Sequence, residues 1–127
     1  MYVPFDRLPD EARVWIYATN RHLSDKEVIA IEQELIAFLT QWTAHQQALE
    51  ASFSIPYNNF IVIGLNENKN LASGCSIDAS VHFLKQLERK FKVDLKQRNT
   101  EFHMEAPIHM FLSKVTLRRR AARKRTS

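Results

Sequence analysis

Residues 49–65 read LEASFSIPYNNFIVIGL, and this stretch decides the fold. Every second residue from Leu49 to Ile55 is apolar, which is the pattern of a strand with one solvated face. The letters PYNN at 56–59 are typical of a turn. Residues 60–65 have no polar face and predict a strand inside the sheet. We therefore expect an antiparallel hairpin whose first strand is either at the edge of the sheet or half-exposed to water, and whose second strand is central.

Helical patterns lie on both sides of this hairpin. Ser24 begins a capping box with Glu27, and apolar residues then recur at helical spacing, which predicts a helix over 25–44. A second helix is predicted to begin near Ser76 or Ile77. The buried stripes are expected at Val28, Ile31, Leu35, Phe38, Leu39 and Trp42 in the first helix, and at Ile77, Val81, Leu84, Leu87 and Phe91 in the second.

The elements at the two ends complete the predicted order. Residues 13–17, RVWIY, are rich in β-branched and aromatic types and predict a first strand. Phe102 and Met104 alternate with polar residues and predict a short last strand. The fold class is therefore α+β in the ferredoxin-like order β-α-β-β-α-(β), with two helices on one face of an antiparallel sheet. Residues 1–117 are expected to form a single domain, and 118–127 a basic, disordered tail.

The first strand carries the expected interaction face. Successive side chains of a strand point to opposite faces, so Trp15 and Tyr17 oppose Val14 and Ile16. If the helices cover the Val14 side, the two aromatic residues lie on the open face of the sheet. Such a face binds a partner or a second copy of the chain. We therefore expect Trp15 and Tyr17 to form an interaction surface, with a homodimer as one outcome.

Charge and composition narrow the class of protein. The 127 residues include 18 basic and 14 acidic ones, and six of the basic ones lie in the last ten positions. The first 117 residues therefore hold 12 basic against 14 acidic residues, a net charge of −2. The folded body is mildly acidic, and the basic character belongs to the tail. The single cysteine, the lack of a signal peptide and the lack of a membrane span predict a reduced, cytoplasmic protein.

Three stretches carry a resemblance to known proteins: VWIY at 14–17, QWTAH at 41–45 and ASGCSIDASVHF at 72–83. Together they resemble a small family of uncharacterised bacterial proteins that often carry the label "ABC transporter ATPase". The resemblance covers roughly residues 1–95, and the SGCSID letters are its most specific part.

The label implies ATP hydrolysis, but the residues do not supply it. A P-loop needs the pattern GxxxxGK followed by Ser or Thr, because bare backbone amides must surround the phosphates. The chain has only Gly64 and Gly74, and no lysine follows either. We therefore expect no P-loop ATPase activity.

Cys75 is the candidate catalytic residue. It lies at the predicted start of the second helix, where backbone amides and the helix dipole favour a thiolate. His45 is the candidate base, at the end of the first helix. Asp78 lies in the same predicted turn and opposes the thiolate. The alternative is that Cys75 is a small, inert side chain packed beneath the loop.

The same helix start is a candidate anion site. Ser73, Gly74, Ser76 and Asp78 mark it, because amides and hydroxyls at a helix N-terminus bind carboxylates or phosphates. The alternative is ordinary capping by Ser73 or Ser76. No metal site and no cofactor are expected, since the histidines and the cysteine show no ligand spacing: His22, His45, Cys75, His82, His103 and His109.

These features favour a small binding or interaction domain that self-associates through an open sheet face. The first alternative is a thiol-dependent enzyme or redox protein using Cys75. The second is a nucleic-acid-binding domain, because the RRM fold shares this strand order and displays aromatic residues on its first and third strands. However, residues 59–65 lack the basic and aromatic stretch that such a third strand carries.

Overall fold

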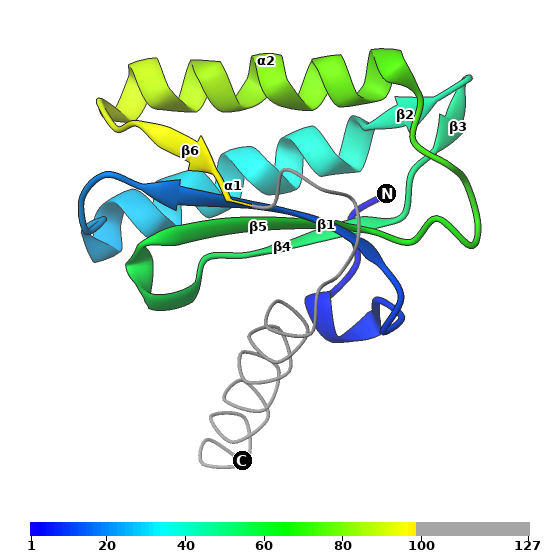
Figure 1. The fold of residues 1–127 in the computed structure, drawn as a ribbon, viewed down its shortest axis with the longest axis horizontal. Helices are drawn as coiled ribbons and strands as arrows, with labels where there is room; N and C mark the ends of the chain where they lie inside the picture. Colours follow the sequence, from blue (N-terminus) through cyan, green and yellow to red (C-terminus); the bar gives the residue numbers. More distant parts are fainter. Residues whose placement is uncertain (99–127) are drawn as a thin grey trace.

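The computed structural model describes residues 1–98. In this part, two helices cover one face of a four-stranded antiparallel sheet, and a two-stranded hairpin lies beside the start of the second helix (Figure 1). The strands of the main sheet are β1 (Arg13–Thr19), β4 (Ala51–Ser54), β5 (Phe60–Leu65) and β6 (Leu95–Gln97). The remaining elements are α1 (Asp25–Gln41), α2 (Gly74–Phe91), the hairpin strands β2 (Thr43–Ala44) and β3 (Gln47–Ala48), and the 3-10 turns η1 (Phe5–Arg7) and η2 (Pro56–Asn58).

The strand order in the sheet is β4-β5-β1-β6, and each pair is antiparallel. The hairpin predicted from residues 49–65 is confirmed, with β4 at the edge and β5 inside the sheet. β1 pairs with β5 over six residues and with β6 only at its end, from Tyr17 to Thr19. The backbone N–H of Arg98 continues this second ladder by donating to the carbonyl of Ile16 at 2.8 Å.

Helix α1 begins at the predicted capping box. The N–H of Glu27 donates to the Ser24 hydroxyl at 3.1 Å, and the Ser24 N–H donates to the Glu27 carboxylate at 3.0 Å. The helix ends at Gln41, three residues before the predicted end, because Trp42 takes an extended ψ of 125°. The predicted stripe is fully buried at Ile31, Leu35, Leu39 and Trp42.

Helix α2 begins at Gly74, two residues before the predicted start, because Ser73 rather than a later residue is the cap. Its buried face is also shifted from the predicted one. Val81 is 39% exposed, whereas two small polar residues, Ser76 and Ser80, are buried together with Phe83, Leu84 and Leu87. The apolar spacing did not reveal this, since a serine that packs closely carries no hydrophobic signal.

The helices cover the face of β1 that carries Trp15 and Tyr17. These side chains are 6% and 7% exposed and belong to the main core between helices and sheet. Trp15 packs edge-on against Trp42, with ring centroids 6.2 Å apart, and burial raises the pKa of the Tyr17 hydroxyl. The expectation that these aromatic residues form an open interaction face is therefore wrong. Both faces of β1 are apolar, so the alternation alone could not show which face the helices cover.

A smaller cluster lies on the other face of the sheet. Val14 and Ile16 pack there with Phe5 and Val62. Ser52 and Ser54 of β4 were expected to face water, but they are 0% and 2% exposed. The expectation of a solvated face on this strand is therefore wrong. The strand register pairs Ser52 with Gly64 and Ser54 with Val62, which places both serines on this buried side.

Some expectations concern the part of the chain that follows residue 98. The strand at Phe102 and Met104, the domain boundary at residue 117 and the tail at 118–127 lie outside the described residues. Within residues 1–98, neither helix has the length and apolar character that crossing a membrane requires.

Candidate functional site

The loop at residues 66–73, between β5 and α2, is held in place by its own polar side chains. The amide of Asn66 donates to the Glu50 carboxylate at 2.6 Å, and its oxygen accepts from the backbone N–H of Asn68 at 3.1 Å. The amide of Asn70 donates to the carbonyl of Ala48 in β3 at 2.9 Å. The loop is therefore fixed to Glu50, the residue before β4, and to the β2–β3 hairpin.

Carboxylates complete this loop. Glu50 also binds Lys69 at 3.2 Å, and the Asn68 amide donates to Glu11 at 2.8 Å. The hydrogen bond from Asn66 lowers the pKa of Glu50, and the bond from Asn68 lowers the pKa of Glu11. Both groups consequently stay ionised at neutral pH and keep accepting these bonds.

The start of α2 follows directly. The Ser73 hydroxyl accepts from the Ser76 N–H at 3.1 Å, while the Ser76 hydroxyl accepts from the Ser73 N–H at 2.8 Å and donates to the Ser73 carbonyl at 2.8 Å. Both predicted anion-binding hydroxyls are therefore occupied within the cap. This geometry favours the capping interpretation for these two serines.

Gly74 and Cys75 lie exposed just inside the helix. Apart from its chain neighbours and its own helix backbone, no atom of the described residues lies within 4 Å of a Cβ placed on Gly74, and Gly74 does not have a positive φ. Neither packing nor backbone conformation therefore requires glycine at this position. Cys75 is exposed, so it is not packed beneath the loop as the alternative expected.

His45 is not at the end of the first helix. It lies in the turn between β2 and β3 with a φ of 49°, followed by Gln46 with a φ of 65°. Two successive residues in the left-handed region form the type of hairpin turn that usually carries Asn-Gly, and each such residue costs about 1 kcal/mol or more. Both side chains are exposed. No hydrogen bond between His45 and Cys75 is present within residues 1–98, and their pairing stays a prediction.

Asp78 was expected in the first turn of the second helix, but α2 begins four residues earlier, at Gly74. Asp78 is exposed and lies three residues after Cys75, so the two side chains are neighbours on the helix surface.

The β2–β3 hairpin and the start of α2 meet at one end of the molecule. The indole N–H of Trp42, just before β2, donates to the carbonyl of Ser76 at 2.9 Å within the core. Leu71, in the fixed loop, is 68% exposed, the largest exposed fraction among the described large apolar side chains. We call the exposed residues Leu71, Gly74, Cys75, His45 and Gln46 the loop end.

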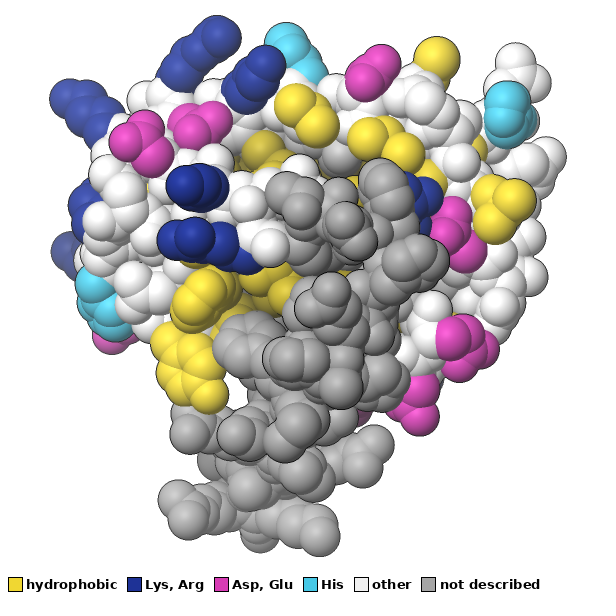
Figure 2. Space-filling model, in the orientation of Figure 1, with side chains coloured by type: hydrophobic (Ala, Val, Ile, Leu, Met, Phe, Trp, Pro, Cys, Tyr) yellow, Lys and Arg dark blue, Asp and Glu magenta, His cyan; other side chains and the backbone are white. Residues whose placement is uncertain are grey.

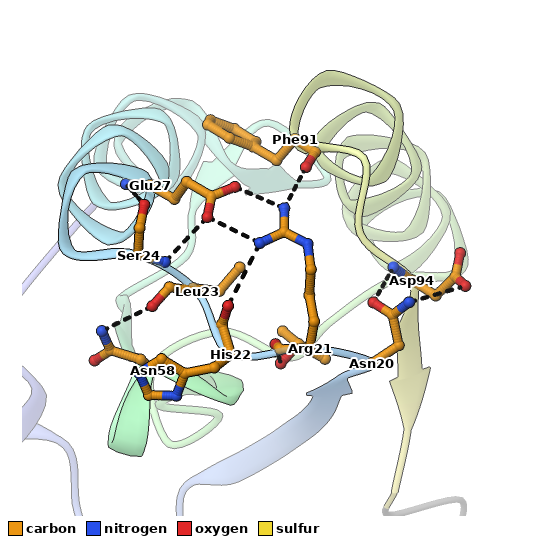
Figure 3. A network of polar contacts seen from close by, with 10 residues as sticks. Asn20, Arg21, His22, Leu23, Ser24, Glu27, Asn58, Phe91 and Asp94 are labelled. Atoms are coloured by element: carbon orange, nitrogen blue, oxygen red, sulfur yellow. Dashed lines mark hydrogen bonds and ion pairs between the residues drawn. The ribbon is translucent and has the colours of Figure 1, made fainter.

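A polar network lies at the opposite end of α2, and the sequence analysis did not predict it. Arg21 binds Glu27 and the carbonyl of Phe91, and Asn20 exchanges backbone and side-chain bonds with Asp94 (Figure 3). Arg21 and a bond from Ser24 lower the pKa of Glu27 to about 2. An arginine three residues before a capping box is the only sequence signal of this network.

Comparison with known protein families, curated proteins and solved structures found no match to this chain. Among residues 1–98, no group of three or more His, Cys, Asp or Glu side chains is placed to hold a metal ion.

Proposed function

We propose that the chain is a small binding domain that contacts a partner through the loop end. The observation that carries this proposal is the fixation of an exposed loop by several polar side chains, three of which reach the residue before β4, β3 and the segment before β1. A loop that is already ordered loses little conformational entropy when it binds. Rigid scaffolds with exposed loops are the common form of binding sites.

Two further features support the same surface. Gly74 leaves the backbone open to a neighbouring molecule, and no internal contact accounts for it. The turn at His45 and Gln46 keeps two left-handed residues exposed, and such strained residues concentrate at functional sites. The strand order β4-β5-β1-β6 supports assignment to the ferredoxin-like class, which serves many binding functions. The resemblance to the proteins labelled "ABC transporter ATPase" stays a prediction.

Site-specific photocrosslinking tests the proposal in the full chain. A benzophenone amino acid replaces Leu71 in one variant and Gln33, an exposed residue of α1, in a matched control. After irradiation in bacterial cells, we expect a discrete adduct from position 71 that is missing from position 33. The adduct should disappear when Gly74→Arg fills the open surface. Identical adducts from both positions, or none from either, would contradict the proposal.

We expect the mass of the adduct to equal that of two chains, which would make a second copy of the chain the partner. Sedimentation velocity then gives a species near twice 14.9 kDa, and Leu71→Glu should return it to the monomer. A larger or smaller adduct assigns the loop end to another partner and removes self-association from the proposal.

Thiol chemistry at Cys75 is the second candidate function, and the exposure of this residue at the second position of α2 favours it. Iodoacetamide alkylation at pH 7 provides the test. A rate about ten times that of glutathione or more supports an activated thiol, since tenfold corresponds to about one pKa unit. A rate equal to that of glutathione removes this candidate.

A further inference from the structure

We propose that the exposed cations of the C-terminal half of α2 and of residues 92–98 bind the phosphate backbone of a nucleic acid. We call this surface the basic end, and its members are Lys85, Arg89, Lys92, Lys96 and Arg98. It goes beyond the function proposed above, because the loop end lies at the other end of α2. Ten residues of α2, a rise of about 15 Å, separate Cys75 of the loop end from Lys85, the member of the basic end nearest to it along this helix.

Charge is distributed unevenly over the described residues. Residues 85–98 hold six basic and two acidic side chains, whereas residues 1–84 hold five basic and ten acidic ones. Lys and Arg side chains gather over the C-terminal half of α2 and over β6 (Figure 2). A molecule polarised in this way orients itself toward a polyanion and raises the rate of encounter.

The carboxylates near the basic end are already engaged. Glu88 accepts a bond from the backbone N–H of Leu95 at 2.9 Å, and Asp94 accepts from the amide of Asn20 at 3.4 Å. Glu34 forms an ion pair with Lys90 at 2.7 Å. Lys90 is therefore not counted as a member of the basic end. The five members of the basic end form no ion pair within residues 1–98.

The five side chains follow one another along α2 and the segment after it. Lys85 and Arg89 are four residues apart and share one side of α2, away from the buried Leu84 and Leu87. Lys92 is the C-cap of the helix, Lys96 lies in β6, and Arg98 directly follows β6. Single charges that follow one another match the repeated phosphates of a nucleic acid, whereas a small anion needs donors that converge on one point.

Lys92 gives an independent reason to assign a function to this surface. It ends α2 in the left-handed conformation, with φ 52° and ψ 55°, where glycine is the usual residue. The helix dipole does not require it, because Arg89 and Lys90 already lie in the last turn. The chain therefore has a cation at a position where glycine would have the lower conformational energy. The sequence after residue 98 has seven basic residues and two acidic ones.

Fluorescence anisotropy with a labelled single-stranded uridine 20-mer tests the proposal. All variants carry serine in place of Arg118, Arg119, Arg120, Arg123, Lys124 and Arg125, so that the tail cannot account for binding. We expect Lys85→Glu combined with Arg89→Glu to weaken binding at low salt by about tenfold or more. The plot of the logarithm of the binding constant against the logarithm of salt concentration has a negative slope. Its magnitude should decrease by about 0.7 for each phosphate that the variant no longer neutralises. The matched control reverses two exposed cations elsewhere, Arg7→Glu and Lys26→Glu, and should keep both values.

One further variant and two other anionic ligands distinguish phosphate binding from a damaged fold and from general charge attraction. Lys92→Gly should weaken RNA binding although it favours the fold, which distinguishes weaker phosphate binding from a damaged structure. Equal weakening by the control pair, or no RNA binding in the tail-substituted background at low salt, overturns the proposal. Binding to phosphatidylserine vesicles or polyglutamate in place of RNA also overturns it. The adduct at position 71 should not change in the Lys85→Glu, Arg89→Glu variant, so the two proposals fail independently.

Discussion

The guanidinium of Arg21 binds the carboxylate of Glu27 through two hydrogen bonds, of 2.9 and 2.7 Å. The same guanidinium donates to the carbonyl of Phe91 at 2.7 Å, so one side chain joins the start of α1 to the end of α2 (Figure 3). The bidentate geometry makes this pair more specific than an ordinary surface ion pair.

This pair predicts a defined pH dependence of stability. The Arg21 bond is the main cause that lowers the pKa of Glu27 to about 2, while an unfolded glutamate titrates near 4.3. The contribution to stability is therefore present above about pH 4.3 and is lost as the pH falls toward 2. We expect Glu27→Gln to be less stable than wild type at pH 6 and to lose less stability between pH 4.5 and 2. Thermal unfolding across this range measures the difference.

Glu32→Gln is the matched control for this experiment, since no hydrogen bond or ion pair within residues 1–98 involves that side chain. It should follow the wild-type pH profile. If Glu27→Gln and Glu32→Gln give the same profile, the Arg21 pair does not contribute to acid unfolding.

Trp42→Phe should destabilise the domain by about 2 kcal/mol or more. The change removes the buried hydrogen bond from the indole to the Ser76 carbonyl and also leaves a gap beside Trp15. Urea unfolding followed by circular dichroism measures the loss. Trp15→Phe removes a similar volume but no hydrogen bond to a described residue, so it should cost less. Equal losses would mean that the bond from Trp42 adds nothing beyond packing.

The two glycines should respond in opposite directions to alanine. A Cβ on Gly64 would lie 2.5 Å from the Leu8 side chain, so Gly64→Ala should cost about 1–3 kcal/mol. Leu8→Ala in the same chain should remove part of this penalty. Gly74→Ala meets no atom and should be neutral or stabilise α2 by up to about 1 kcal/mol. The midpoints of urea unfolding measure both changes in stability. A large loss of stability in Gly74→Ala would show that the surface at this residue is not open.

Lys92→Gly should stabilise the domain by about 1 kcal/mol. Glycine adopts the left-handed conformation without the steric penalty of a side chain, and Lys92 has that conformation at the end of α2. Lys90→Gly, inside the helix, is the control and should destabilise. A loss of stability from Lys92→Gly in thermal unfolding would show that the lysine side chain contributes more than its backbone strain removes.

Asp78→Asn should increase the alkylation rate of Cys75 at pH 7 by about twofold, because it removes a negative charge one turn from the thiol. Asp25→Asn changes a charge at the other helix and should leave the rate unchanged. Both variants should react like wild type in urea. An unchanged rate for Asp78→Asn in the folded protein would mean that the carboxylate does not influence the thiol.

Local signals predicted the elements of this fold well. The capping box at Ser24, the apolar stripe of α1 and the hairpin around residues 56–59 each depend on neighbours in sequence, and the structure contains all three. The first strand was likewise found, because β-branched and aromatic residues cluster at 13–17.

Choices between equivalent alternatives were less predictable. β1 is apolar on both faces, so only the packed helices decide that Trp15 rather than Val14 lies beneath them. His45 continued an apolar spacing, and no Gly or Pro marked the end of α1 before it. The basic end was hidden because the charges of the whole body nearly cancel, although they separate along the chain.

The position of β1 also determines when the sheet can be completed during synthesis. β1 is made before the other strands of the main sheet, yet it lies between β5 and β6, and its pairing with β6 joins residues nearly eighty positions apart. The β4–β5 hairpin closes a short loop and can form early. The edge of β1 can pair only after α2 and β6 have been synthesised. A ribosome that pauses before residue 95 would hold a chain with this edge unpaired, the condition in which a strand is most open to pairing with another molecule.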